Sequence, residues 1–248
     1  MQQDAIKINA IVVRSKESGE NDRTLTLLSP EVGKITVMAK GVKSLRHKSR
    51  SSCFPLSYSS FVLKKIKDNL YSLTSADLIE SFRPLCEDVL LLSYGAYFAD
   101  LCSMCVQSGT EADEEVRLLL NTLYVLSKRA DDAPYIKTVF ELRMAELCGI
   151  VPEFSYECPC GRKGMFFSPS DAQILCDAHK TPDALAITQE EISVLLYILE
   201  NPLKDALFAK CDTSAAISTG RITEAFLRYH LSILPPSLDY LHQITKKL

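Results

Sequence analysis

The feature that most constrains the fold is a change of pattern close to Pro84, where short strand-like runs give way to helical spacing. Before that point, five short runs are rich in Val, Ile, Thr, Leu and Tyr, and several alternate between apolar and polar residues. Turn-like segments such as KESGEND, PEVG and KDN separate them. Five short strands in this arrangement predict a small closed barrel, with the OB-fold as the leading candidate.

After Pro84 the apolar residues take helical spacing. Residues 88–106 are apolar on nearly every side, which predicts a helix at the buried centre of its domain. A second helix is expected within residues 133–153, where Gly149 provides a stop signal. A third should begin after Thr188 with a capping box, and a fourth should cover about residues 214–233 and end before two prolines.

The predicted fold class is therefore a two-domain β + α protein. We expect residues 1–82 to form an N-terminal OB-fold barrel and residues 83–248 to form an all-α domain. A stretch at residues 156–180 that contains Cys and His should be inserted between helices of the second domain.

Charge is distributed unevenly along the chain. The net charge is −3, yet the first eighty residues carry thirteen Lys and Arg against eight Asp and Glu. The stretch from Gly33 to Lys67 contains nine basic residues and no acidic one. Such a segment suits a polyanionic partner, because each cation near a phosphate releases condensed counterions. We favour nucleic acid over a solvated basic loop that has no partner.

The candidate DNA-binding cations lie in and around this stretch. They are Arg14, Arg23, Lys34, Lys40, Lys43, Arg46, Lys48 and Arg50. OB-fold barrels combine a cationic groove with aromatic side chains on which bases stack. The aromatic candidates are Phe54, Tyr58, Phe61 and Tyr71, and the alternation of the strands assigns most of them to the core.

The chain has no signal-peptide pattern and no apolar run long enough to cross a bilayer, so we expect a cytoplasmic protein without a membrane partner. In that reducing compartment, its nine cysteines should be thiols or metal ligands and not a disulfide framework.

Four potential metal ligands lie in one short polar stretch: Cys158, Cys160, Cys176 and His179. Thiolate and imidazole are ligands that zinc prefers, and four of them close a tetrahedral shell, which predicts a structural Zn²⁺. The alternative is a knuckle that keeps its fold without metal. A catalytic zinc needs an open coordination position and usually a nearby carboxylate base, and the acids in this stretch have no metallohydrolase spacing.

No other pattern indicates catalysis. The sequence contains no P-loop, dinucleotide fingerprint or nucleophile elbow, so we expect no nucleotide site and no enzyme.

Several motifs, in order along nearly the whole chain, resemble those of the bacterial RecO family of DNA repair and recombination proteins. In the first half they are Arg14, Gly19-Glu20-Asn21-Asp22-Arg23, Glu31-Val32-Gly33-Lys34 and Lys40-Gly41. Later matches are LIESF, FELRMAELCGIVPE, FSP and FLRYHL. The family usually has two C-x-x-C pairs. Here Cys160 matches a family cysteine, Cys158 is displaced by one residue, and His179 replaces the last cysteine.

The resemblance implies an OB-fold, a helical domain and a zinc-finger-like insertion. It also implies a mediator that binds single- and double-stranded DNA, anneals complementary strands and associates with the nucleoid. RecO-like proteins engage the C-terminal tail of single-strand-binding protein, and with RecR they help load RecA recombinase in the RecF pathway. The competing interpretations are an RNA-binding OB/zinc protein and a metal-dependent nucleic-acid hydrolase.

Overall fold

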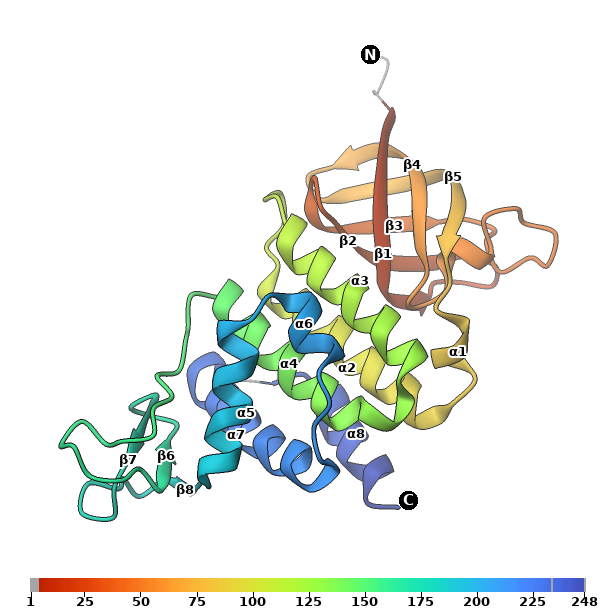
Figure 1. Cartoon of the computed structure of the whole chain (residues 1–248). Helices are drawn as coiled ribbons and strands as arrows, with labels where there is room; N and C mark the ends of the chain where they lie inside the picture. The colour runs from red at the N-terminus through yellow and green to blue at the C-terminus, as the bar shows by residue number, and fades with distance from the viewer. Residues whose placement is uncertain (1–4, 233, 248) are drawn as a thin grey trace. The chain divides into compact units, whose positions relative to one another are not determined.

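The computed structural model describes residues 5–232 and 234–247 (Figure 1). The chain forms two compact units. The first comprises the residues up to Ser127 and again from Pro235, and the second runs from Lys128 to Leu234. The predicted domain boundary at residue 82 does not coincide with the boundary between these units. It lies where the barrel strands end and the helices begin, and it stays a prediction. None of the helices in these residues has the length and apolar character needed to span a bilayer.

The N-terminal strands close into a barrel, as the alternation predicted. They are β1 (Ala5–Glu17), β2 (Arg23–Ser29), β3 (Gly33–Ala39), β4 (Tyr58–Lys67) and β5 (Leu70–Glu80). Their order is β1-β2-β3-β5-β4, and every neighbouring pair is antiparallel except β3 and β5. A closed five-stranded barrel with this pairing is consistent with an OB-fold.

Alternate strand residues fill the barrel, and the outer face of β1 is buried as well. The interior side chains include Ile8, Ala10, Val12, Leu25, Leu27, Ile35, Val37, Phe61 and Leu63. The pairing of β1 with β2 shifts register between Val12 and Arg14, and three successive residues, Ile11 to Val13, are buried there. Helix α2 (Val89–Cys105) packs against β1, so this strand contributes to two interfaces.

Helix α2 (Val89–Cys105) is the apolar helix predicted at residues 88–106. Asp88 caps it, because the Asp88 carboxylate accepts hydrogen bonds from the backbone N–H of Leu90 and Leu91 at 2.8 and 2.9 Å. Buried residues occur around most of its circumference, Tyr97, Phe98 and Leu101 among them. It therefore forms the centre of the helical part of the first unit.

Three further helices belong to the first unit. They are α1 (Arg83–Cys86), α3 (Asp113–Lys128) and α8 (Pro236–Thr245), and the last packs against α2. The sequence interpretation missed α8, because two adjacent prolines predict the end of the preceding helix and give no sign of a new one. Pro236 instead begins the helix, where its fixed φ and missing N–H are tolerated.

The second unit combines helices with a small sheet. The helices are α4 (Ala133–Leu147), α5 (Gln189–Glu200), α6 (Leu203–Phe208) and α7 (Thr213–Leu231). The predicted capping box is present, with Thr188 and Glu191 bonding each other's backbone N–H. The strands β6 (Phe166–Ser168), β7 (Gln173–Leu175) and β8 (Leu185–Ala186) pair in the order β7-β6-β8.

Each unit also contains a short 3₁₀ turn. These are η1 (Ser51–Cys53) in the first unit and η2 (Ala130–Asp132) in the second.

A buried ionic network joins α4 to α7 within the second unit. Lys137 Nζ lies 2.8 Å from Glu141 Oε1 and 2.6 Å from Glu224 Oε1, and Thr223 donates a hydrogen bond to the Glu141 carboxylate. Burial alone would lower the pKa of Lys137, but the two carboxylates outweigh it and raise the pKa. The lysine therefore stays charged between the two helices.

We expect Lys137→Met to destabilise the second unit by about 3–5 kcal/mol, because Glu141 would remain buried without its cation. Hydrogen exchange measured on peptides from α4 and α7 should accelerate. The double variant Lys137→Met/Glu141→Leu should recover part of the stability, and Lys210→Met, at an exposed position, is the control. Unchanged exchange in the single variant would contradict this account of the network.

Candidate nucleic-acid surface and metal site

Residues 40–57 connect β3 to β4 and form an ordered series of turns on the barrel (orange in Figure 1). The backbone N–H groups of Ser44, His47, Arg50 and Cys53 each donate to the carbonyl three residues earlier, at 3.0 to 3.2 Å. Four turns thus follow one another without interruption. We call residues 40–57 the cationic loop.

The cationic loop is fixed to the barrel at several points. The Gly41 N–H donates to Asp22 Oδ1 at 2.7 Å, and the Ala76 N–H on β5 donates to Ser49 Oγ at 2.8 Å. Val42 and Cys53 are buried in the barrel core. A loop held at its start, middle and end presents its remaining side chains in defined positions.

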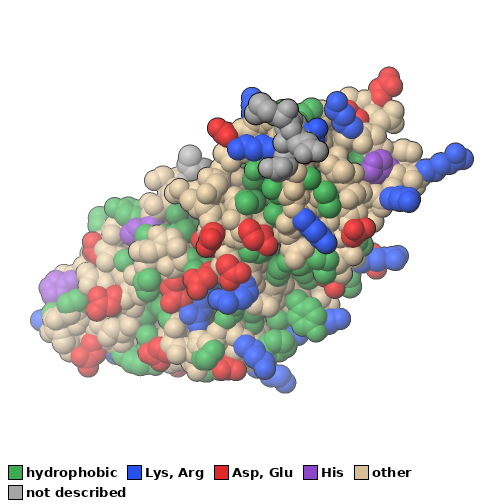
Figure 2. Space-filling model, turned by 90° about the horizontal axis from the view of Figure 1, so that it is seen from above, with side chains coloured by type: hydrophobic (Ala, Val, Ile, Leu, Met, Phe, Trp, Pro, Cys, Tyr) green, Lys and Arg blue, Asp and Glu red, His purple; other side chains and the backbone are tan. Residues whose placement is uncertain are grey.

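The structure brings six of the eight predicted DNA-binding cations together and places two elsewhere. On or beside the cationic loop lie Arg23, Lys40, Lys43, Arg46, Lys48 and Arg50. Lys40, Arg46 and Lys48 are exposed, whereas Lys43 is half-buried and forms an ion pair with Glu17 at 3.0 Å. Figure 2 shows Lys and Arg side chains projecting at the right-hand end of the view.

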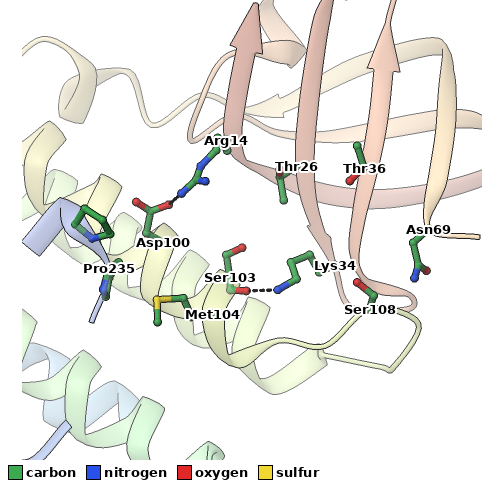
Figure 3. A pocket seen from close by; sticks show the side chains of 11 residues that line it. Arg14, Thr26, Lys34, Thr36, Asn69, Asp100, Ser103, Met104, Ser108 and Pro235 are labelled. Carbon is green, nitrogen blue, oxygen red and sulfur yellow. Dashed lines mark hydrogen bonds and ion pairs between the residues drawn. The ribbon is translucent and has the colours of Figure 1, made fainter. Parts of the chain in front are cut away.

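Arg14 and Lys34 point toward α2 instead (Figure 3). Arg14 forms an ion pair with Asp100 at 2.9 Å, and Lys34 Nζ donates to the Ser103 carbonyl at 2.6 Å. Both residues line a pocket of about 390 Å³ that also includes Thr26 on β2. These two cations already have partners within the first unit. Their contact with DNA stays a prediction, and the other six cations are the better candidates for the DNA-binding surface.

Among the four aromatic candidates, Phe54 is the exposed one. Phe61 and Tyr71 are buried in the barrel core, and Tyr58 is half-buried. The guanidinium carbons of Arg23 and Arg50 lie 5.2 and 5.7 Å from the centre of the Phe54 ring. An exposed ring beside two guanidinium groups is the combination on which unpaired bases stack.

The four predicted metal ligands converge in the second unit. Their ligand atoms all lie within 4.8 Å of one another. His179 Nδ1 is 3.5 Å from Cys158 Sγ and 3.6 Å from Cys176 Sγ, and the sulfurs of Cys160 and Cys176 are 3.7 Å apart. Sulfur at about 2.3 Å and nitrogen at about 2.0 Å from a tetrahedral ion are separated by roughly 3.5–3.8 Å. The group is therefore positioned to hold a metal ion.

Two backbone turns place these ligands. The Gly161 N–H donates to the Cys158 carbonyl at 2.8 Å, and the His179 N–H donates to the Cys176 carbonyl at 3.0 Å. The backbone N–H of Cys160, opposed by desolvation and assisted by His179, lowers the pKa of Cys158 to about 6. A lowered pKa favours the thiolate, the form that binds metal.

The insertion has more core than the sequence indicated. Its composition is that of a short polar stretch, but Phe167 on β6 and Ile174 on β7 are fully buried. The Phe167 ring contacts Phe154 and Phe226 at centroid distances of 5.2 and 6.0 Å. The strands were missed because each is only two or three residues long, too short for periodicity to reveal.

Sequence reasoning also missed the residues that support the cationic loop. Asp22 accepts from the loop backbone, and the Asn-Asp pair in a turn was a signal that it could do so. Ser49 gave no such signal, because its buried hydroxyl depends on pairing with a strand twenty-seven residues away.

Comparisons with known proteins agree along the chain. The family model described as "Recombination protein O N terminal" matches residues 1–82, and "Recombination protein O C terminal" matches residues 86–239. A DNA repair protein RecO from Acetivibrio thermocellus is 29% identical over 97% of this chain and 98% of its own length. One from Caldicellulosiruptor bescii is 32% identical over 80% of this chain and 82% of its own length.

We expect Cys176→Ser to abolish metal binding, because it removes one of four converging ligands. Elemental analysis of protein prepared without chelators should give about one ion per chain for the unaltered protein and almost none for the variant. Cys86→Ser, which changes an exposed thiol outside the site, should keep the ion. Equal metal contents in the unaltered protein and Cys176→Ser would show that these four residues are not the ligands.

Proposed function

The chain belongs to the RecO family of DNA repair proteins, and from this premise we propose that it is a DNA-binding mediator without enzymatic activity of its own. In this role it binds single- and double-stranded DNA and anneals complementary strands. With RecR and single-strand-binding protein, it helps load RecA recombinase in the RecF pathway, at the nucleoid. The observation that carries the proposal is the cationic loop.

Two properties of the cationic loop support DNA as its ligand. Its exposed cations, Lys40, Arg46 and Lys48, lie in a stretch of sequence without acidic residues, so phosphates can approach them with little opposing charge. Its backbone is fixed before binding, which lowers the entropy lost when the side chains engage phosphates. Phosphate contacts carry no base information, so binding should be largely independent of sequence.

The metal that best suits the Cys₃His group is zinc, in a structural role. Three thiolates and one imidazole form a ligand set that zinc prefers, and four protein ligands leave no coordination position for water or substrate. The same argument weighs against a metal-dependent hydrolase. An RNA-binding role would differ from the proposed DNA-binding role only in the nucleic acid that is bound. Competition between RNA and DNA of equal length distinguishes the two roles.

Partner binding follows from the family and not from a surface identified on this chain. The tail of single-strand-binding protein is acidic and apolar, so its site should combine a cation with an apolar pocket. RecR would bind elsewhere, since both act together in loading RecA. These partners are therefore tested by function.

A fourfold variant, in which Gln replaces Lys43, Arg46, Lys48 and Arg50, should bind DNA more weakly than the unaltered protein. Its binding should also depend less on salt. The slope of log affinity against log salt should fall by roughly 0.7 to 0.9 for each phosphate that the variant no longer neutralises. Fluorescence anisotropy at several salt concentrations measures this slope. Folding should change little, because a partly exposed ion pair such as Lys43–Glu17 contributes little stability.

The matched control removes four exposed cations of the second unit, Lys204, Lys210, Arg221 and Arg228. It should leave the slope unchanged. If the control variant had a reduced slope and the loop variant did not, the DNA surface would lie on the second unit, and our assignment would be wrong.

We further expect the protein to anneal complementary oligonucleotides coated with single-strand-binding protein, without added nucleotide. Fluorescence energy transfer between end-labelled strands follows the reaction. Annealing should fail when the coating protein lacks its C-terminal tail, because the tail would no longer recruit this chain. Annealing that requires nucleotide, or no annealing of coated strands at all, would refute the proposed role.

A further inference from the structure

Leu45, in the cationic loop, is unusually exposed for an apolar side chain. Its relative exposure is 82%, and no other large apolar side chain within residues 5–232 and 234–247 exceeds 56%. Exposing leucine to water forfeits the free energy of burying it. The described part of the chain leaves this side chain uncovered, so it is available to a ligand.

Disorder of the loop does not explain this exposure. The turn closed by Ser44 N–H and the Gly41 carbonyl lies just before Leu45, and the turn closed by His47 N–H and the Ser44 carbonyl contains it. Neighbouring residues anchor the loop to the barrel: Val42 lies in the core, and the Ser49 hydroxyl accepts a hydrogen bond from Ala76 N–H on β5. The leucine is thus held outward by a backbone that is fixed on both sides of it.

The residues around Leu45 indicate the kind of partner. Arg46 follows directly and is exposed, and Lys48 lies three residues on and is also exposed. The acidic side chain that pairs with the loop, Glu17, binds Lys43 and not these two cations. An apolar side chain beside exposed cations fits a ligand that has anionic groups outside and flat apolar surfaces inside. Nucleic acid has this composition, with phosphates flanking stacked bases.

We propose that Leu45 is a wedge that enters the base stack of DNA while Arg46 and Lys48 contact the flanking phosphates. This inference rests on the cationic loop being the DNA-binding surface. Leucine is one of the side chains that architectural proteins insert between base steps, where it unstacks them at a cost that the phosphate contacts offset. Unstacking at the loop would expose base edges where two complementary strands begin to pair.

The wedge is tested with 2-aminopurine, whose fluorescence rises when it leaves the stack. Duplexes and single-strand–duplex junctions carrying this base are titrated with the full-length protein. The unaltered protein should produce a rise, and it should be larger beside a flexible TA step. Leu45→Ala should abolish the rise yet keep the salt slope of binding, because the phosphate contacts remain. Leu45→Met, which keeps a long apolar side chain, should restore it.

Ile79→Ala is the matched control, since Ile79 is 54% exposed on β5, outside the loop. It should behave as the unaltered protein does. A full fluorescence rise in Leu45→Ala would overturn the wedge. Weaker binding of that variant to a protein partner such as RecR, with the rise intact, would likewise overturn it and assign Leu45 to a protein interface.

The experiments distinguish a wrong proposal for Leu45 from a wrong proposal for the DNA-binding surface. If Leu45→Ala keeps the rise while the fourfold loop variant no longer binds, the loop binds DNA and only the wedge is wrong. If the fourfold variant binds DNA with unaltered slope, the surface itself is wrong, and the wedge with it.

Discussion

The first compact unit depends on the close approach of one backbone segment to Gly33, the first residue of β3. A side chain at this position would place its Cβ 2.4 Å from the carbonyl oxygens of Gln107 and Thr110, and Gly33 has φ of +63°. Both conditions require glycine. The segment after α2 then bonds the β2–β3 turn, through Lys34 N–H to the Gln107 carbonyl and Gly109 N–H to the Val32 carbonyl.

This close approach decides which cations remain available to a ligand. Because the end of α2 lies against β3, Lys34 reaches the Ser103 carbonyl, near the helix C-terminus, where backbone carbonyls lack helical partners and favour a cation. Arg14 pairs with Asp100 on the same helix. Part of the positive charge of the barrel is thus used to hold the barrel to its own helix, whereas Lys40, Arg46 and Lys48 on the cationic loop stay exposed. A motif that suggests DNA binding by its charge can have an architectural role.

The distance along the sequence between interacting residues explains what the sequence could and could not predict. Strand alternation and the capping box at Thr188 are local signals, and the structure confirms both because burial and capping act within a few residues. The metal ligands were identifiable because four suitable donors lie within twenty-two residues. Lys137 illustrates the opposite case, since its charge balance depends on Glu224 on another helix. Contacts between distant segments leave no periodic trace in a single sequence.

In the cationic loop, two motifs that are separate in the sequence interact with each other in the structure. The turn Gly19 to Arg23 and the Lys40-Gly41 pair resemble separate elements of a family pattern, yet they form one structure. Asp22 accepts the Gly41 N–H, and the Asn21 carbonyl accepts the N–H of Lys43. Asp22 in the first motif therefore fixes the backbone of the basic motif through this hydrogen bond, and it leaves Arg46 and Lys48 exposed. A fixed backbone with exposed cations is what a phosphate-binding surface requires, because the ordering entropy is lost during folding and not during binding.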